Sequence, residues 1–126
     1  MRVIEEKIIG KKSQELCEDG IVVNDDFVAV IDGSTSKTPL RINDGMTNGR
    51  FCMEKVCSLL NDIPCDTTME EFCAMSTDMI FRIYMDKGLD ISLLKADPIQ
   101  RMTASAVVFS RSLQEVWMIG DCHCIV

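Results

Sequence analysis

Two apolar stretches each run out onto an aspartate beside a glycine, and these aspartates are the residues best suited to chemistry. Phe27–Ile31 leads into Asp32-Gly33, and Val116–Ile119 leads into Gly120-Asp121. A third acidic step, Glu18-Asp19-Gly20, precedes the first stretch. Carboxylates at strand ends are held by rigid backbone yet stay open to solvent, and Mg²⁺ and Mn²⁺ prefer such oxygen ligands. The pattern therefore indicates a divalent-metal site.

The chemistry that such a site supports is phosphoryl transfer to water. A divalent cation bound by several carboxylates lowers the pKa of its water and orients a phosphoryl group for in-line attack. Asp32 and Gly33 lie one hairpin away from Glu18 and Asp19, so all four can meet at one edge of a sheet. Each motif taken singly is better explained as a turn, because Asp and Gly are favoured there. Their joint order and spacing favour the metal site.

The elements that must position these carboxylates predict a single α+β domain over residues 1–126, with antiparallel sheets and two long antiparallel helices. Strands and helices do not alternate, which argues against a βαβ fold. Thr68 and Glu71 have the spacing of a capping box and predict the start of the second helix. The predicted elements are a strand at 2–10, a hairpin at 21–31, a loop at 34–48, helices between 50 and 87, a connector at 89–101, a hairpin at 103–119 and a strand from 124.

Composition and charge exclude several classes of protein. A net charge of −7 without a basic stripe argues against nucleic-acid binding, because nothing neutralises phosphates. No apolar run reaches the length of a membrane span, and the first residues lack the apolar core of a signal peptide, so we expect a cytoplasmic protein with no membrane contact. The seven cysteines are an odd number and are expected to be reduced and mostly buried.

In this order the motifs resemble the metal-dependent protein serine/threonine phosphatases of type 2C (PPM-like). That family has an acidic pair, a strand ending in Asp-Gly, two long helices, a hairpin, and a strand ending in Gly-Asp. The resemblance covers nearly the whole chain and implies the N-terminal half of a four-layer αββα sandwich. The matching segments are Glu18-Asp19, Val28–Gly33, the helices between Arg50 and Lys87, Thr103–Val108 and Val116–Asp121.

The resemblance also implies roles for individual residues. Asp32 would bridge two Mg²⁺ or Mn²⁺ ions, with the Gly33 carbonyl as a further ligand. Glu18 and Asp19 would bind the same ions directly or through water, and Asp121 would hold an additional ion. The nucleophile would be metal-bound water, and the substrate a phosphoserine or phosphothreonine protein.

Two features of the chain depart from the family pattern. Gln14 stands where the family commonly has an arginine that holds the substrate phosphate, and Lys11 or Lys12 could take that role, with Lys12 as the candidate. The family's other metal-binding aspartates would lie beyond Val126. The resemblance is therefore compatible with a fragment of a longer phosphatase, with a short relative that pairs with a second copy, or with a degenerate noncatalytic module. Self-association is expected in each case, because an incomplete core leaves sheet edges unpaired.

Other interpretations stay open beside this one. Asp32–Lys37 also resembles the phosphate loop of the sugar-kinase and actin-like ATPase superfamily, although that loop places one residue between the Asp and the Gly. A noncatalytic dimerising or regulatory module of the same fold is the alternative from another functional class. Cys122-His123-Cys124 lacks the second ligand pair that a zinc site needs. Trp117 is expected in the core or at an interface.

Overall fold

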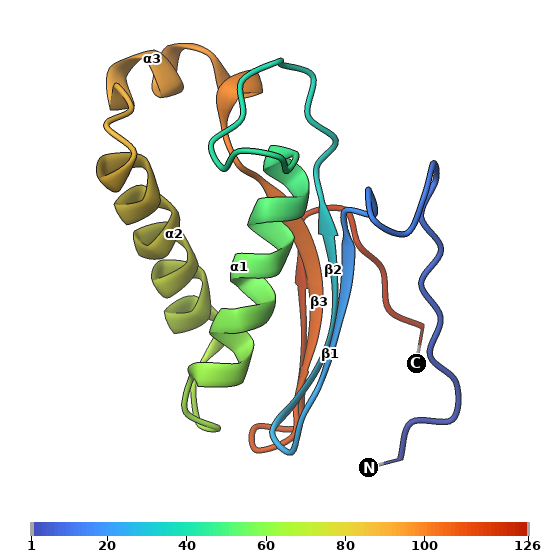
Figure 1. The fold of residues 1–126 in the computed structure, drawn as a ribbon. Coiled ribbons are helices and arrows are strands. Elements are labelled where there is room, and N and C mark those ends of the chain that lie inside the picture. The colour runs from blue at the N-terminus through green and yellow to red at the C-terminus, as the bar shows by residue number, and fades with distance from the viewer. Residues whose placement is uncertain (1, 126) are drawn as a thin grey trace.

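The computed structural model describes residues 2–125 as two layers, a four-stranded sheet and the helices that cover one of its faces (Figure 1). An α+β fold with an antiparallel sheet and two long helices is thus confirmed, and a third helix is added to it. In chain order the elements are β1 (Asp19–Val23), β2 (Phe27–Gly33), α1 (Asn48–Asp62), α2 (Met69–Asp86), α3 (Ile91–Ala96), a 3₁₀ turn (Pro98–Gln100), β3 (Ala104–Ser110) and β4 (Glu115–Ile119).

The sheet is an antiparallel meander in the order β1-β2-β3-β4. Hairpins join β1 to β2 and β3 to β4, whereas all the helices lie in the connection between β2 and β3. In the first hairpin, the Asn24 side-chain oxygen accepts hydrogen bonds from the backbone N–H groups of Asp26 (3.0 Å) and Phe27 (2.7 Å). Such Asx turns are the reason that asparagine is favoured at tight turns, and this one sets the register of β1 against β2.

The core lies between the sheet and the helices. Alternate residues of each strand point toward α1 and α2, among them Ile31 and Val108, which are fully buried. Trp117 on β4 is 2% exposed, and its ring lies 5.9 Å from Phe27 and 5.7 Å from Phe72, measured between ring centroids. These aromatic contacts join β2 and β4 to α2. Trp117 is therefore a core residue, as predicted.

The start of α2 is a capping box, as the sequence predicts. The Thr68 hydroxyl accepts a hydrogen bond from the Glu71 N–H, and the Glu71 carboxylate accepts one from the Thr68 N–H. Only Phe72 and Tyr84 of this helix are buried, so α2 packs on the core through a narrow stripe. Neither this helix nor any other in residues 2–125 is long and apolar enough to cross a bilayer.

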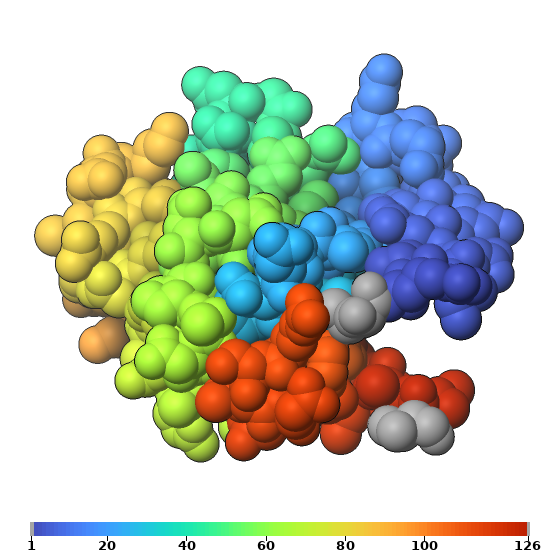
Figure 2. Space-filling model, turned by 90° about the horizontal axis from the view of Figure 1, so that it is seen from below, coloured from blue at the N-terminus to red at the C-terminus, as the bar shows by residue number. Residues whose placement is uncertain are grey.

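The outer face of the sheet, the side away from α1 and α2, carries no helix (Figure 1). Ile21, Val30, Val107 and Met118 form one row of apolar side chains across all four strands. Val30 is 49% exposed and Met118 59% exposed. The N-terminal segment and the segment after β4 lie on the side of the molecule away from α2, and an open notch separates them (Figure 2). The outer face is therefore apolar and largely uncovered.

Three of the predicted elements differ from the structure. Residues 2–10 form no strand, because β1 ends the sheet and these residues pair with no other segment in the described chain. Cys124 and Ile125 also lie in no strand, and Val126 is outside the described residues. The predicted connector at 89–101 contains α3, which begins where the Asp90 side chain accepts a hydrogen bond from the Ser92 N–H.

The two faces of β4 differ in what they contribute to stability, and adjacent residues test this. Trp117→Ala is expected to lower the free energy of unfolding by about 3–5 kcal/mol, because it leaves a cavity between Phe27 and Phe72. Met118→Ala, on the outer face, is expected to cost less than about 1 kcal/mol. Urea unfolding followed by circular dichroism measures both, and equal losses would contradict this assignment of faces.

Candidate functional site

Three aspartates meet at one end of the outer face. Asp19 and Asp32 are direct partners in the antiparallel pairing of β1 with β2, and Ser105 is the partner of Asp32 on β3. The Ser105 hydroxyl and an Asp121 carboxylate oxygen lie 2.6 Å apart, and the Asp121 N–H donates to the same hydroxyl at 3.3 Å. Strand register and one serine thus bring the acidic ends of β1, β2 and β4 together.

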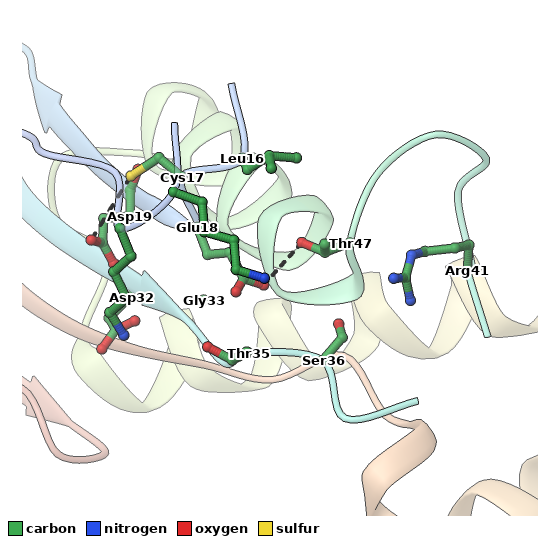
Figure 3. A pocket seen from close by; sticks show the side chains of 12 residues that line it. Leu16, Cys17, Glu18, Asp19, Asp32, Gly33, Thr35, Ser36, Arg41 and Thr47 are labelled. Atoms are coloured by element: carbon green, nitrogen blue, oxygen red, sulfur yellow. Dashed lines mark hydrogen bonds between the residues drawn. The ribbon is translucent and has the colours of Figure 1, made fainter. Parts of the chain in front are cut away.

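Beside this acidic row lies a cavity of about 240 Å³ (Figure 3). Four of the predicted metal-site residues line it, and so does Lys12, the predicted phosphate ligand. Asp121 does not line the cavity but lies next to it, because ligand atoms of Asp32, Asp121 and Cys122 are all within 4.8 Å of one another. The four metal-site residues in the lining are Glu18, Asp19, Asp32 and Gly33.

The first turn of α1 holds the Glu18 carboxylate in place. The hydroxyl of Thr47, the residue that caps α1, donates to Glu18 Oε2 at 2.9 Å and accepts from the Arg50 N–H at 3.2 Å. The Arg50 guanidinium donates to the carbonyls of Glu15 (2.7 Å) and Cys17 (2.9 Å), which fixes the loop before β1. Glu18 is therefore positioned on both sides, by its own loop and by the helix.

The charges in the acidic row repel one another. The pKa of Asp32 is raised by partial desolvation first, and then by the charge and proximity of Asp19 and by the charge of Asp121. Lys11 acts in the opposite direction and lowers it. The pKa of Asp121 is instead lowered, chiefly by its hydrogen bonds with Ser105 and with its own backbone. A divalent cation at this row would relieve the repulsion on Asp32.

The donor set fits a hard cation. Asp19, Asp32 and Asp121 offer carboxylate oxygens, which suit Mg²⁺ or Mn²⁺. Two soft groups lie nearby. The Cys17 thiol donates to the Asp19 carboxylate at 3.9 Å, and the pKa of the Cys122 thiol is raised by desolvation together with the three aspartates. A hard cation prefers the carboxylate oxygens to either sulfur.

Sequence reasoning missed four residues of the cavity lining: Leu16, Cys17, Arg41 and Thr47. Thr47 was detectable, since a threonine before a helical segment is a common N-cap. Arg41 lies in the aperiodic loop after β2, where no local pattern indicates which way a side chain points. Gln14, at the position of the family's phosphate-binding arginine, binds the Gly10 N–H and the Ile8 carbonyl, and does not line the cavity.

Comparison of the chain with family models, with curated proteins and with solved structures gave no match. The resemblance to type 2C phosphatases therefore stays a prediction, and so do the roles that it implies for single residues.

Removing one charge from the acidic row is expected to stabilise the metal-free protein. The pKa of Asp32 is higher in the folded protein than the ordinary value of 3.8. Protonation of Asp32 therefore stabilises the folded state fully well below pH 3.8, and this stabilisation is lost as pH rises through the raised pKa. Asp32→Asn should therefore raise the melting temperature in EDTA at neutral pH. The corresponding gain in the free energy of unfolding is at most about 1 kcal/mol, because solvent screens the charges. The gain should disappear in acid.

Asp25→Asn, in the turn between β1 and β2 at the opposite end of the sheet, is the matched control and should change little. Thermal unfolding of both variants at acid and neutral pH makes the comparison. A loss of stability for Asp32→Asn at neutral pH would contradict the electrostatic account.

Proposed function

We propose that this chain carries the metal-binding part of a phosphomonoesterase that acts on phosphoserine or phosphothreonine in proteins, with the architecture of the N-terminal half of a type 2C phosphatase. The observation that carries the proposal is that Asp32 lies beside Asp19, its partner on β1, and that its ligand atoms lie within 4.8 Å of those of Asp121 and Cys122. Within residues 2–125, none of the three aspartates makes an ion pair with a lysine or arginine. Carboxylates held together without a direct ion pair suit a divalent cation.

Each group near the row has a defined task in such a reaction. Bound Mg²⁺ or Mn²⁺ would supply an activated water and neutralise phosphoryl charge. Asp32 lies centrally, with Asp19 beside it on β1 and Asp121 beyond β3, so it is placed to share ions with both. Glu18, fixed by Thr47, is oriented without needing to reorganise. Lys11 and Lys12 at the same cavity can offset the charge of a bound phosphate.

The outer face supports the finer architectural proposal. Its apolar row runs directly into the acidic row, because Asp19, Asp32 and Ser105 are the next outward residues of the same strands. In an αββα sandwich a second sheet packs on this face at about 10 Å. Such a sheet would exclude water from the apolar row and also wall one side of the metal site.

The test is metal-dependent hydrolysis of p-nitrophenyl phosphate and of a phosphothreonine peptide. The protein should show turnover that requires Mn²⁺, and Asp32→Asn should reduce it about a hundredfold or more, because a bridging ligand underlies several kcal/mol of charge stabilisation. Asp25→Asn should retain the activity. Isothermal titration with Mn²⁺ gives an independent readout of the site, and wild-type protein that binds no Mn²⁺ would overturn the proposal.

A second candidate function, a noncatalytic module that self-associates, is favoured by the exposed outer face. By ordinary strand spacing this face measures roughly 300 Å², so two faces in contact bury less than a typical stable interface. Weak, concentration-dependent association is expected for this candidate, and Val30→Asp should abolish it. Phe81→Asp, at an exposed position of α2, is the matched control.

Sedimentation velocity over a range of concentrations measures the association. Mn²⁺ binding by a self-associating protein that shows no Mn²⁺-dependent turnover would favour the module over the enzyme. A monomer at all concentrations would contradict the module.

A further inference from the structure

The cavity beside the acidic row has two ends of opposite charge. Asp19 and Asp32 lie at one end, and the Arg41 guanidinium lies across the cavity from them (Figure 3). Between them lie Glu18, Thr35, Ser36 and Thr47. Lys11 belongs to the acidic end, because its charge acts on Asp32. Arg41 thus adds to the cavity a cation that the sequence did not suggest.

The loop that presents Arg41 is tied to the rest of the protein. Thr38 is 7% exposed, and its hydroxyl hydrogen-bonds the side chain of Gln100 at 2.7 Å. Asn48, the first residue of α1, is 2% exposed, accepts from the Ile42 N–H at 3.0 Å and donates to the Leu40 carbonyl at 3.1 Å. Both neighbours of Arg41 are thus bonded to one buried side chain, and the arginine is not carried on a free loop.

One nitrogen of the Arg41 guanidinium donates to backbone carbonyls, and the other two are available to bind a ligand. Nη1 donates to the carbonyls of Thr38 (2.8 Å) and Leu40 (3.2 Å), which orients the planar group. Nε and Nη2 make no hydrogen bond to residues 2–125, and no carboxylate among those residues lies within 4.0 Å. A guanidinium with a free edge binds carboxylate or phosphate through two parallel hydrogen bonds.

We propose that Arg41 binds a second anionic group of the substrate, so that the site selects phosphoserine or phosphothreonine peptides with an acidic residue close to the phosphorylated one. This inference rests on the proposed function, which places the phosphoryl group at Asp19 and Asp32. Arg41 lies across the cavity from that position, and Glu18 and hydroxyl side chains lie between them. Arg41 is thus a specificity-determining residue.

The experiment measures peptide binding in Mn²⁺ by fluorescence anisotropy, using a non-hydrolysable phosphonate in place of phosphoserine. A series of peptides carries a single Glu, or Gln as the neutral match, at each of the neighbouring positions on either side. Wild-type protein should bind the Glu peptide about fivefold more tightly than its Gln match at one or more positions, as expected for a partly exposed charge pair. Arg41→Gln should remove this preference and leave affinity for the Gln peptides unchanged.

Arg111→Gln, in the turn between β3 and β4 at the far end of the sheet, is the matched control and should keep the preference. Equal affinity of the wild-type protein for Glu and Gln peptides would overturn the inference while leaving the proposed function intact. So would an Arg41→Gln variant that loses affinity for both kinds of peptide equally, because Arg41 would then contact the phosphoryl group itself. Absence of Mn²⁺-dependent binding to every peptide would overturn the proposed function and this inference together.

Discussion

The site depends on a close approach between two glycines, where the end of β2 meets the start of α1. A Cβ atom on Gly33 would lie 2.1 Å from the Gly49 carbonyl oxygen, and a Cβ on Gly49 would lie 2.2 Å from Ser34 O and from Glu18 Oε2. No side chain fits in either place, so the backbones touch directly. This contact lets the first turn of α1 reach Glu18. It also places Thr47 in the lining of the cavity that Asp32 borders.

Packing on the inner face of the sheet explains why the acidic row can exist on a small protein. Asp32 lies next to Asp19 and near Asp121, and their repulsion opposes folding. The opposing contributions come from the other face of the same strands, where Ile31, Val108 and Trp117 are buried against the helices. A strand that is rigidly packed on one side can hold charges together on the other, which is how binding sites keep a strained arrangement of charge.

The sequence predicted the elements whose signal is local and repeated. Alternation in β2 and β4, helical spacing in α1 and α2, and the capping box at Thr68 each rest on several residues that agree. Residues 2–10 also have strand-like composition. A strand needs a partner, however, and the residues of one segment do not show whether another segment pairs with it. α3 has only six residues, too few for periodicity to appear, so its one local signal was the N-cap Asp90. Arg41 was out of reach for a related reason, because its loop is held by hydrogen bonds to Gln100 and to Asn48, the first residue of α1.

Strand alternation also links the acidic row to the apolar outer face. Asp32 follows Val28 and Val30 on the outward side of β2, and Asp19 precedes Ile21 and Val23 on β1. Any surface that covers those aliphatic side chains must therefore end against the carboxylates. Water would leave the two regions together, and charge interactions at the acidic row would strengthen as the apolar row became buried. The proposed metal chemistry and the binding of a second layer are therefore coupled, because a single sheet face carries both.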